Sequence, residues 1–321
     1  MRNSEALKRI ADFLKRNDDF LLLTHKHPDG DCLGSALTLH CVLEKIGKRS
    51  CVCNIDEVPM YISMLPQEKI HNKTALPFKP KAQVFVDCSD AERAGCEDIF
   101  DKSLPTACID HHATANTDFE AAYIDADAAA AGELVYDVMK ELGVQPDAEI
   151  ALYLYVAIST DSGNFSFSCT NRDTFTIAAE CLNYGIDLDS LNYEMFRKRT
   201  RERTRLLGRA LSGIRYLCGG RFALMILRQE DFEVTGASFA DTEGVVNYGI
   251  DTAGAAVAVL AVEQGEIAKF SFRSRGEVNV AKLAKQFGGG GHDRASGASI
   301  KGDFDAAVEQ VMQACIRETG E

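Results

Sequence analysis

Acidic and imidazole side chains gather in one short stretch near the start of the chain. His25, Asp29 and Asp31 follow an apolar run, and Pro28 and Gly30 flank the first of the two aspartates. Carboxylate oxygens and imidazole nitrogens are the ligands that Mn²⁺ and related divalent ions prefer in proteins. Pro and Gly fix a bent backbone that a solvated acidic turn would not need, although such a turn is the alternative for this stretch alone. The stretch therefore predicts a metal site.

Three later segments end in the same residue types. In chain order these are Asp87, then the triplet Asp110-His111-His112, then Asp161. Taken singly, Asp87 could cap a helix and Asp161 could belong to a Ser/Gly turn. The triplet is harder to explain in this way, because two adjacent imidazoles at a strand end point in different directions, one toward a metal and the other toward a substrate. We expect all these groups to converge, as the carboxyl ends of parallel strands do.

Apolar segments of strand length alternate with helical patterns up to about residue 185. The expected strands are 20–23, 50–55, 82–86, 106–109 and 121–124, and the expected helices are 1–19, 32–46, 131–142, 147–158 and 172–184. This alternation predicts an α/β fold whose N-terminal domain is a doubly wound, mostly parallel sheet.

The pattern changes beyond residue 185. A basic run at 197–205 separates two apolar-rich regions, so we expect an interdomain connector there, either a solvated helix or a helix that lends positive potential to a cleft. A smaller second α/β domain is predicted from strand patterns at 214–217, 222–227, 255–262 and 267–272, and from helical patterns at 242–248, 280–287 and 303–317.

Four consecutive glycines precede His292. Each glycine loses more backbone entropy on folding than any other residue, and we find no reason in packing for four of them at 288–291. We therefore expect the chain to approach a ligand closely here and to aim N–H groups at an anion. A flexible loop is the alternative.

The composition limits which partners the protein can have. The chain has 321 residues, 46% of them hydrophobic, and a formal net charge of -13. This charge excludes a protein that coats long nucleic acid, since such binding needs a broad basic face. No segment has the length of a membrane span, residues 1–19 lack the apolar core of a signal peptide, and the eleven Cys form no C-x-x-C pair. We expect a cytoplasmic protein with reduced thiols and no membrane partner.

Taken together, the motifs resemble those of the DHH phosphoesterases, a family named for the triplet found here at 110–112. Residues 25–35 match the family pattern His-x-Asn-Pro-Asp-Gly-Asp-x-x-Gly-Ser, except that His27 occupies the usual Asn position. The second motif is Val86-Asp87 with Ser89-Asp90, and the fourth is Thr160-Asp161-Ser162-Gly163 followed by Phe165 and Phe167. Residues 288–292 resemble the Gly-Gly-Gly-His signature of the associated C-terminal domain. The resemblance covers essentially the whole chain and is closest to the short, two-domain members of the nanoRNase type.

The resemblance implies a domain organisation and a metal centre. It implies a catalytic domain over 1–188, a helical basic linker over 189–213 and a substrate-binding domain over 214–321, with the active site in the cleft between the domains. The implied ligands of two divalent ions are His25, Asp29, Asp31, Asp87, His111 and Asp161, with Asp87 bridging. Two such ions would balance four carboxylates that otherwise repel one another. An oxygen-rich ligand set without thiolate favours Mn²⁺, with Mg²⁺, Fe²⁺ and Co²⁺ left open.

The resemblance also implies roles for substrate-contacting residues. His112, which together with Asp87 forms the implied catalytic pair, would contact the scissile phosphate or help to protonate the leaving oxygen. In the family the second domain grips the nucleotide, and the implied substrate-binding residues are Arg273, Ser274, Gly289, Gly290, Gly291 and His292.

The expected function is the two-metal hydrolysis of short oligoribonucleotides to 5′-mononucleotides and of pAp to AMP. A phosphodiesterase for cyclic dinucleotides or pApA would use the same metals and stays open. A manganese pyrophosphatase shares the first motifs, but the loop at 288–292 argues against it. A nucleotide- or RNA-binding protein with an inactive site is the alternative of another class, and His27 is its one point of support. The oligomeric state is left open, a homodimer included.

Overall fold

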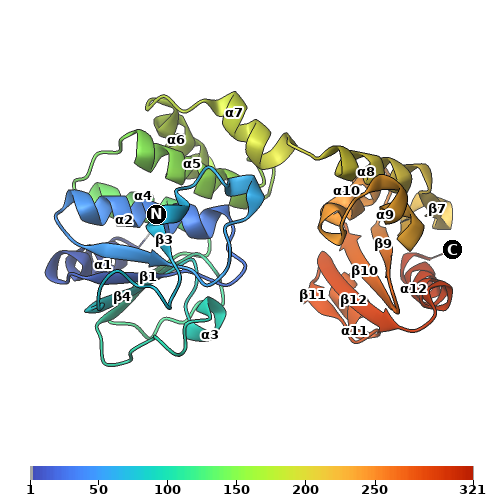
Figure 1. Ribbon diagram of the computed structural model, residues 1–321, viewed down its shortest axis with the longest axis horizontal. Helices are drawn as coiled ribbons and strands as arrows, with labels where there is room; N and C mark the ends of the chain where they lie inside the picture. Colours follow the sequence, from blue (N-terminus) through green and yellow to red (C-terminus); the bar gives the residue numbers. More distant parts are fainter. Residues whose placement is uncertain (1–2, 321) are drawn as a thin grey trace. The chain divides into compact units, whose positions relative to one another are not determined.

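The computed structural model describes residues 3–320, which form two compact units. The first unit extends to Lys198 and the second begins at Arg199 (Figure 1). Each unit has its own sheet and its own buried core. The α/β class expected from the sequence is confirmed.

The first unit is built on a six-stranded parallel sheet with the strand order β3-β2-β1-β4-β5-β6. The strands are β1 (Phe20–Leu23), β2 (Ser50–Cys53), β3 (Ile70–His71), β4 (Ala82–Val86), β5 (Thr106–Asp110) and β6 (Ala121–Ile124). The order reverses between β1 and β4, and in open α/β sheets ligands bind outside the carboxyl ends of the strands at such a point.

Helices and loops cover opposite faces of this sheet. The helices are α1 (Ser4–Arg16), α2 (Gly30–Lys45), α3 (Ala91–Ala94), α4 (Ala131–Glu141), α5 (Ala148–Asp161), α6 (Arg172–Leu182) and α7 (Leu188–Asn192), with short helices η1 (Met60–Ile62), η2 (Gln67–Lys69) and η3 (Tyr193–Arg197). Leu22 packs with α1, α2, α4 and α5 on one face, whereas Leu21 and Leu23 pack with α3 and loop residues on the other. This alternation follows from the two-residue period of a strand.

Small residues let three helices meet beneath the carboxyl ends of the strands. A Cβ atom at Gly34 of α2 would lie 2.5 Å from the carbonyl oxygen of Tyr153 in α5, and one at Gly132 of α4 would lie 2.8 Å from Ala157 Cβ. Only glycine permits these backbone approaches. The contacts fix α2, α4 and α5 against one another, and the first turn of α2 carries Asp31.

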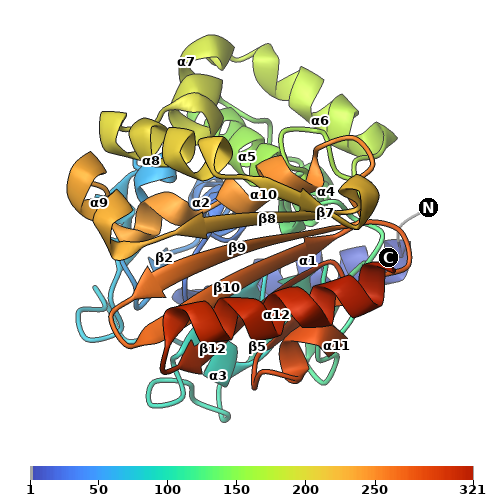
Figure 2. The ribbon, with the colours of Figure 1, turned by 90° about the vertical axis from the view of Figure 1, so that its right-hand side faces the viewer.

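The second unit is built on a mixed sheet with the order β11-β12-β10-β9-β8-β7. Its strands are β7 (Arg215–Leu217), β8 (Phe222–Leu227), β9 (Val257–Gln264), β10 (Ile267–Ser274), β11 (Gly290–His292) and β12 (Ala295–Lys301), and its helices are α8 (Arg201–Ser212), η4 (Cys218–Gly220), α9 (Gln229–Thr235), η5 (Phe239–Thr242), α10 (Val245–Ile250), α11 (Val280–Lys285) and α12 (Phe304–Thr319). Figure 2 shows α12 running alongside strand β10 in front of the sheet. The sheet of the second unit has a buried core on each face. Helices α11 and α12 pack on one face, and α8 and α10 pack on the other.

The stretch 189–213, expected as one helical linker, is divided between the units. Residues up to Lys198 belong to the first unit, and α8 belongs to the second. Leu206 and Ala210, four residues apart on α8, are fully buried against the second sheet. Their spacing makes an apolar stripe that a solvated linker helix would not need.

Within residues 3–320, no helix is both long enough and apolar enough to span a lipid bilayer.

Candidate active site

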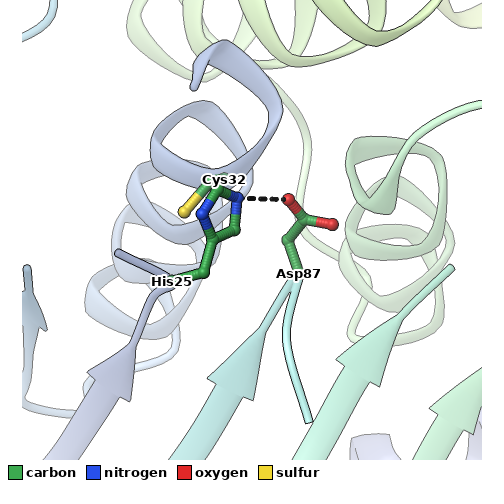
Figure 3. Close-up of side chains that lie close together, drawn as sticks. All are labelled: His25, Cys32 and Asp87. Atoms are coloured by element: carbon green, nitrogen blue, oxygen red, sulfur yellow. Dashed lines mark ion pairs between the residues drawn. The ribbon is translucent and has the colours of Figure 1, made fainter. Parts of the chain in front are cut away.

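His25 follows strand β1, and the backbone orients its ring. Its Nδ1 donates a hydrogen bond to the carbonyl oxygen of Lys26 at 2.8 Å. Its Nε2 therefore faces the acidic groups, 3.2 Å from Asp87 Oδ2 and 3.7 Å from Asp29 Oδ2. Figure 3 shows the ring and the Asp87 carboxylate turned toward each other from β1 and β4. A hydrogen bond on the far nitrogen is the usual way of fixing a metal-binding histidine.

Asp29 and Asp31 lie at the beginning of helix α2. Asp29 is the N-cap residue, and its Oδ1 accepts a hydrogen bond from the N–H of Cys32 at 2.9 Å. Asp31 is completely buried, and its two oxygens accept hydrogen bonds from the N–H groups of Ala131 (2.6 Å) and Gly132 (2.9 Å). These donors open helix α4, whose N-terminus favours a negative charge. The carboxylate of Asp31 is thus held in place from a second helix.

Asp87, directly after β4, is strained and incompletely paired. Its φ is +59°, a left-handed conformation that costs a non-glycine residue about 1–2 kcal/mol. Its side chain is buried, and within the described residues Oδ1 accepts no hydrogen bond, although it lies 3.4 Å from His111 Nε2. Strained residues and orphaned buried oxygens of this kind cluster at functional sites. A bound cation would satisfy this oxygen.

His111 completes the convergence that the sequence predicts. Its Nε2 lies 3.2 Å from Asp161 Oδ2, 3.4 Å from Asp87 Oδ1 and 3.7 Å from Asp31 Oδ2. Asp161 reaches this point from the last residue of helix α5 and not from a turn. All six expected ligand side chains are therefore brought together, from the ends of β1, β4, β5 and α5 and from the beginning of α2.

Cys32 is a neighbour that the sequence analysis missed. Its Sγ, a nitrogen of His25 and an oxygen of Asp87 all lie within 4.8 Å of one another (Figure 3). Burial raises the pKa of the Cys32 thiol well above its usual range, so the protein alone keeps it protonated. The other groups that converge around Asp87 are carboxylates and imidazoles, which suit Mg²⁺, Mn²⁺ or Fe²⁺ better than thiolates do.

Burial and mutual repulsion disfavour the charge on three of the four carboxylates. Burial, followed by the charge of Asp87, raises the pKa of Asp29 and raises that of Asp31 well above its usual range. Burial also raises the pKa of Asp161 to about 6. For Asp87 itself, contacts with the two imidazoles outweigh burial and hold the pKa at about 2.

The imidazoles show the reverse effect. Burial opposes the charged form of His111, but the contact with Asp87 and the charges of Asp31 and Asp161 raise its pKa to about 10. The pKa of His25 is raised in the same way by Asp87 against the opposing effect of burial. Without a cation, protons therefore hold the cluster together.

Metal binding is expected to expel these protons. Metal ligands must be deprotonated, and His111, whose pKa is raised to about 10, carries a proton at pH 7. Titration of the metal-free protein with Mn²⁺ at pH 7 should release at least about one proton per chain, and the apparent affinity should rise with pH. Calorimetry in buffers of different ionisation enthalpy measures the number. His111→Gln should release about one proton fewer, and identical heats in all buffers would contradict the expectation.

The second histidine of the triplet is held between two partners. His112 Nδ1 lies 2.7 Å from Oδ1 of the buried Asp110, and its Nε2 lies 2.9 Å from a guanidinium nitrogen of Arg93. Arg93 can only donate, so Nε2 accepts and the proton of His112 resides on Nδ1. Neither Asp110 nor Arg93 was among the expected catalytic or metal-binding residues. Asp110 stood inside the motif, whereas nothing in local periodicity marks Arg93.

His27, the one departure from the family pattern, lies away from this cluster. Its φ is +53°, a region that Asn and His enter more readily than most residues. Its side chain is 93% exposed, and its N–H donates to Asp56 Oδ2 at 2.7 Å. His27 is therefore suited to its backbone conformation, and its side chain is not one of the converging groups.

His27→Asn should accordingly change kcat/KM less than about twofold, the usual range for an exposed side chain. Steady-state kinetics on the substrates named below measure this ratio. A large gain in activity would mean that the native site is tuned down, which would support the inactive-site alternative.

Two of the expected substrate-binding residues share one face of the second sheet. Arg273 of β10 and His292 of β11 are both paired with Ala295 of β12, so the three lie in one row across adjacent strands. Residues in such a row point to the same face, and strands two apart are separated by about 10 Å. Only the small Ala295 lies between the two side chains. His292 is exposed and Arg273 is half-buried.

Ser274, by contrast, is directed inward. Its hydroxyl is buried and lies 2.7 Å from the carbonyl oxygen of Val278 and 3.2 Å from that of Asp293. The single hydroxyl proton is therefore committed to the loop that follows β10.

The expectation that packing does not explain the glycines is wrong. A Cβ atom at Gly289 would lie 2.1 Å from the carbonyl oxygen of Gly297, and one at Gly291 would lie 2.6 Å from that of Ala295. Gly288 has a φ of +72°. These three are explained by the close approach to β12 and by the turn after α11, and only Gly290 has open space beside its Cα.

Comparison with known proteins places the chain in a family. Residues 19–158 match the DHH family, N-terminal domain, and residues 232–318 match the DHHA1 domain. A Thermus thermophilus protein named bifunctional oligoribonuclease and PAP phosphatase NrnA is 32% identical over 98% of this chain and 94% of its own length. The chain belongs to the DHH family, as its motifs indicated.

Solved structures share the fold. An exopolyphosphatase-related protein from Bacteroides fragilis superposes with a TM-score of 0.89, at 24% identity, over 99% of this chain and 98% of its own. RecJ from Thermus thermophilus, solved in complex with Mn²⁺, has a TM-score of 0.52 at 14% identity, over 98% of this chain and 54% of its own.

Proposed function

We propose that the protein is a divalent-metal-dependent phosphoesterase that hydrolyses short oligoribonucleotides to 5′-mononucleotides and pAp to AMP. The observation that carries the proposal is the convergence of six carboxylate and imidazole side chains, among them the strained Asp87, whose buried Oδ1 accepts no hydrogen bond within residues 3–320. The name of the Thermus thermophilus relative supports the same substrates. An inactive binding protein has no need of such a cluster.

The proposed metal ligands are His25, Asp29, Asp31, Asp87, His111 and Asp161, with Asp87 between the two groups of ligands. We propose Mn²⁺ as the native ion, because the set combines carboxylates with imidazoles. When bound there, two divalent ions supply positive charge to the phosphoryl oxygens and an activated water as nucleophile.

The residues around His112 handle the substrate and the proton. Arg93 uses one nitrogen on His112, and its other N–H groups remain to donate to a phosphoryl oxygen. Because Nε2 of His112 is an acceptor in this arrangement, His112 acts first as a base. It can protonate the leaving oxygen only after it has taken up a proton. In the second unit we assign phosphate contacts to Arg273 and His292, and backbone contacts to the glycines at 289–291.

Product analysis tests the proposal. The metal-stripped protein is given Mn²⁺ and offered pAp, a labelled RNA dinucleotide, a five-nucleotide RNA, cyclic di-AMP and pyrophosphate side by side. We expect Mn²⁺-dependent release of mononucleotides from the short RNAs and of AMP from pAp. Preference for cyclic di-AMP or pyrophosphate, or silence on all five, would overturn the proposed substrate.

We also propose a cytoplasmic location. All eleven cysteines of the described residues are free, which supports a reducing compartment and hence the cytoplasm. A homodimer stays a prediction that sedimentation of the purified protein tests.

A further inference from the structure

The loop that follows Asp161 has an unusual backbone. Gly163, Asn164 and Phe165 have φ values of +58°, +53° and +62°, so three consecutive residues adopt the left-handed conformation. Asn tolerates this region, but a bulky residue such as Phe165 is a genuine outlier there. Such strain persists only where the surroundings impose it, and it is concentrated at ligand-binding sites.

Hydrogen bonds to one buried residue hold this loop next to the candidate metal ligands. The N–H groups of Ser166 and Phe167 donate to the carbonyl oxygen of Ser162 at 2.9 and 3.0 Å, and the N–H of Phe165 donates to its hydroxyl at 3.0 Å. Ser162 directly follows Asp161. The backbone of Phe167 is therefore hydrogen-bonded to Ser162, the residue next to the proposed metal ligand Asp161.

The two phenylalanines of the loop have different environments. The ring of Phe165 packs between aromatic neighbours, 6.0 Å from Tyr155 and 5.4 Å from Phe175 between ring centroids. The ring of Phe167 is 60% exposed and lies against Gly163, where a Cβ atom would come within 2.5 Å of it. The packing of the half-buried Phe165 ring between these two neighbours thus explains the strain, whereas nothing in the core explains the exposed apolar ring of Phe167.

We propose that Phe167 is a stacking surface for the nucleobase next to the scissile phosphate. A flat, exposed ring held on a rigid loop is the feature by which proteins bind a base without reading its identity, since every base has a π-face. The ring would then favour nucleotides over other phosphoesters and accept any base. This inference rests on the proposed function and adds to it a subsite for the base.

The test compares intact and abasic substrates. KM and kcat are measured with Mn²⁺ for an RNA dinucleotide and for two versions that lack the base at the 5′ or the 3′ position. Phe167→Ala should raise KM for the intact dinucleotide about tenfold, within the range of base stacking on an aromatic residue, with a smaller change in kcat. For one of the two abasic versions, wild type and variant should have the same KM. Phe167→Trp should restore the wild-type KM, whereas Phe167→Leu should not.

Phe239 provides the control. Its ring is 39% exposed and lies beneath the ammonium group of Lys269 in the second unit, so Phe239→Ala removes an exposed ring and should leave KM unchanged. An unchanged KM for Phe167→Ala, or an equal rise for intact and both abasic substrates, would overturn the inference while the wild type still hydrolyses RNA. A wild type that hydrolyses none of the three substrates would overturn the proposed function itself.

Discussion

Asp87→Asn should lower kcat by at least about a thousandfold, or about 4 kcal/mol of transition-state stabilisation. Asp87 is the only carboxylate of the cluster within 4 Å of both His25 and His111 in the described residues. Its replacement by a neutral amide removes the carboxylate that contacts both histidines. It also removes a negative charge that would balance the charge of two divalent ions. Activity and metal content should fall together.

The choice of Asn is dictated by the backbone. At φ +59°, Ala would be strained, whereas Asn enters this region readily and matches the shape of Asp. Asp90→Asn is the control, because Asp90 is exposed, lies three residues away and caps helix α3, a role that Asn fills equally well. Kinetics and metal analysis of both variants check the prediction. Wild-type activity of Asp87→Asn with one ion per chain would contradict the two-metal proposal.

The convergence of the proposed metal ligands could be predicted because their sequence signals are local. Each ligand stands at the end of an apolar run, and parallel pairing of β1 with β4 and of β4 with β5 brings those ends to one edge. Asp161, for which a Ser/Gly turn was the alternative, lies at the end of α5, because the helix extends three residues beyond the apolar pattern. The difference did not matter for the convergence, since the helix ends at the same edge.

The arrangement of the proposed substrate contacts was harder to predict because it depends on the register of the strands. The row of Arg273, Ala295 and His292 exists only once β11 and β12 pair with β10, and no sequence spacing shows this pairing. The same pairing gives the glycines their packing role and directs Ser274 inward. Glycine is required where the backbone approaches another strand closely, and equally where it approaches a ligand. A run of glycines in the sequence therefore does not distinguish the two cases.

Asp110→Asn should lower kcat by about 100-fold, in the range of lost general acid–base catalysis. Asp110 Oδ1 accepts from Nδ1 of His112, which keeps the proton there and leaves Nε2 as the acceptor. Asn retains the shape but removes the negative charge that makes Nε2 basic. It also places an amide donor where Oδ2 is buried without a partner among residues 3–320.

A double-variant cycle separates this role from a structural one. If Asp110 acts through the imidazole, His112→Ala should cost a similar factor and the double variant Asp110→Asn/His112→Ala should cost little more, because residues that act as a unit are not additive. Asp118→Asn, an exposed residue of the following loop, is the control for charge. Losses of kcat that add up in the double variant would contradict the assignment. So would an unchanged kcat in Asp110→Asn together with a fall in melting temperature as large as that of the double variant. The cycle thus decides whether the first residue of the triplet contributes to the chemistry or only to the fold, which its burial alone cannot do.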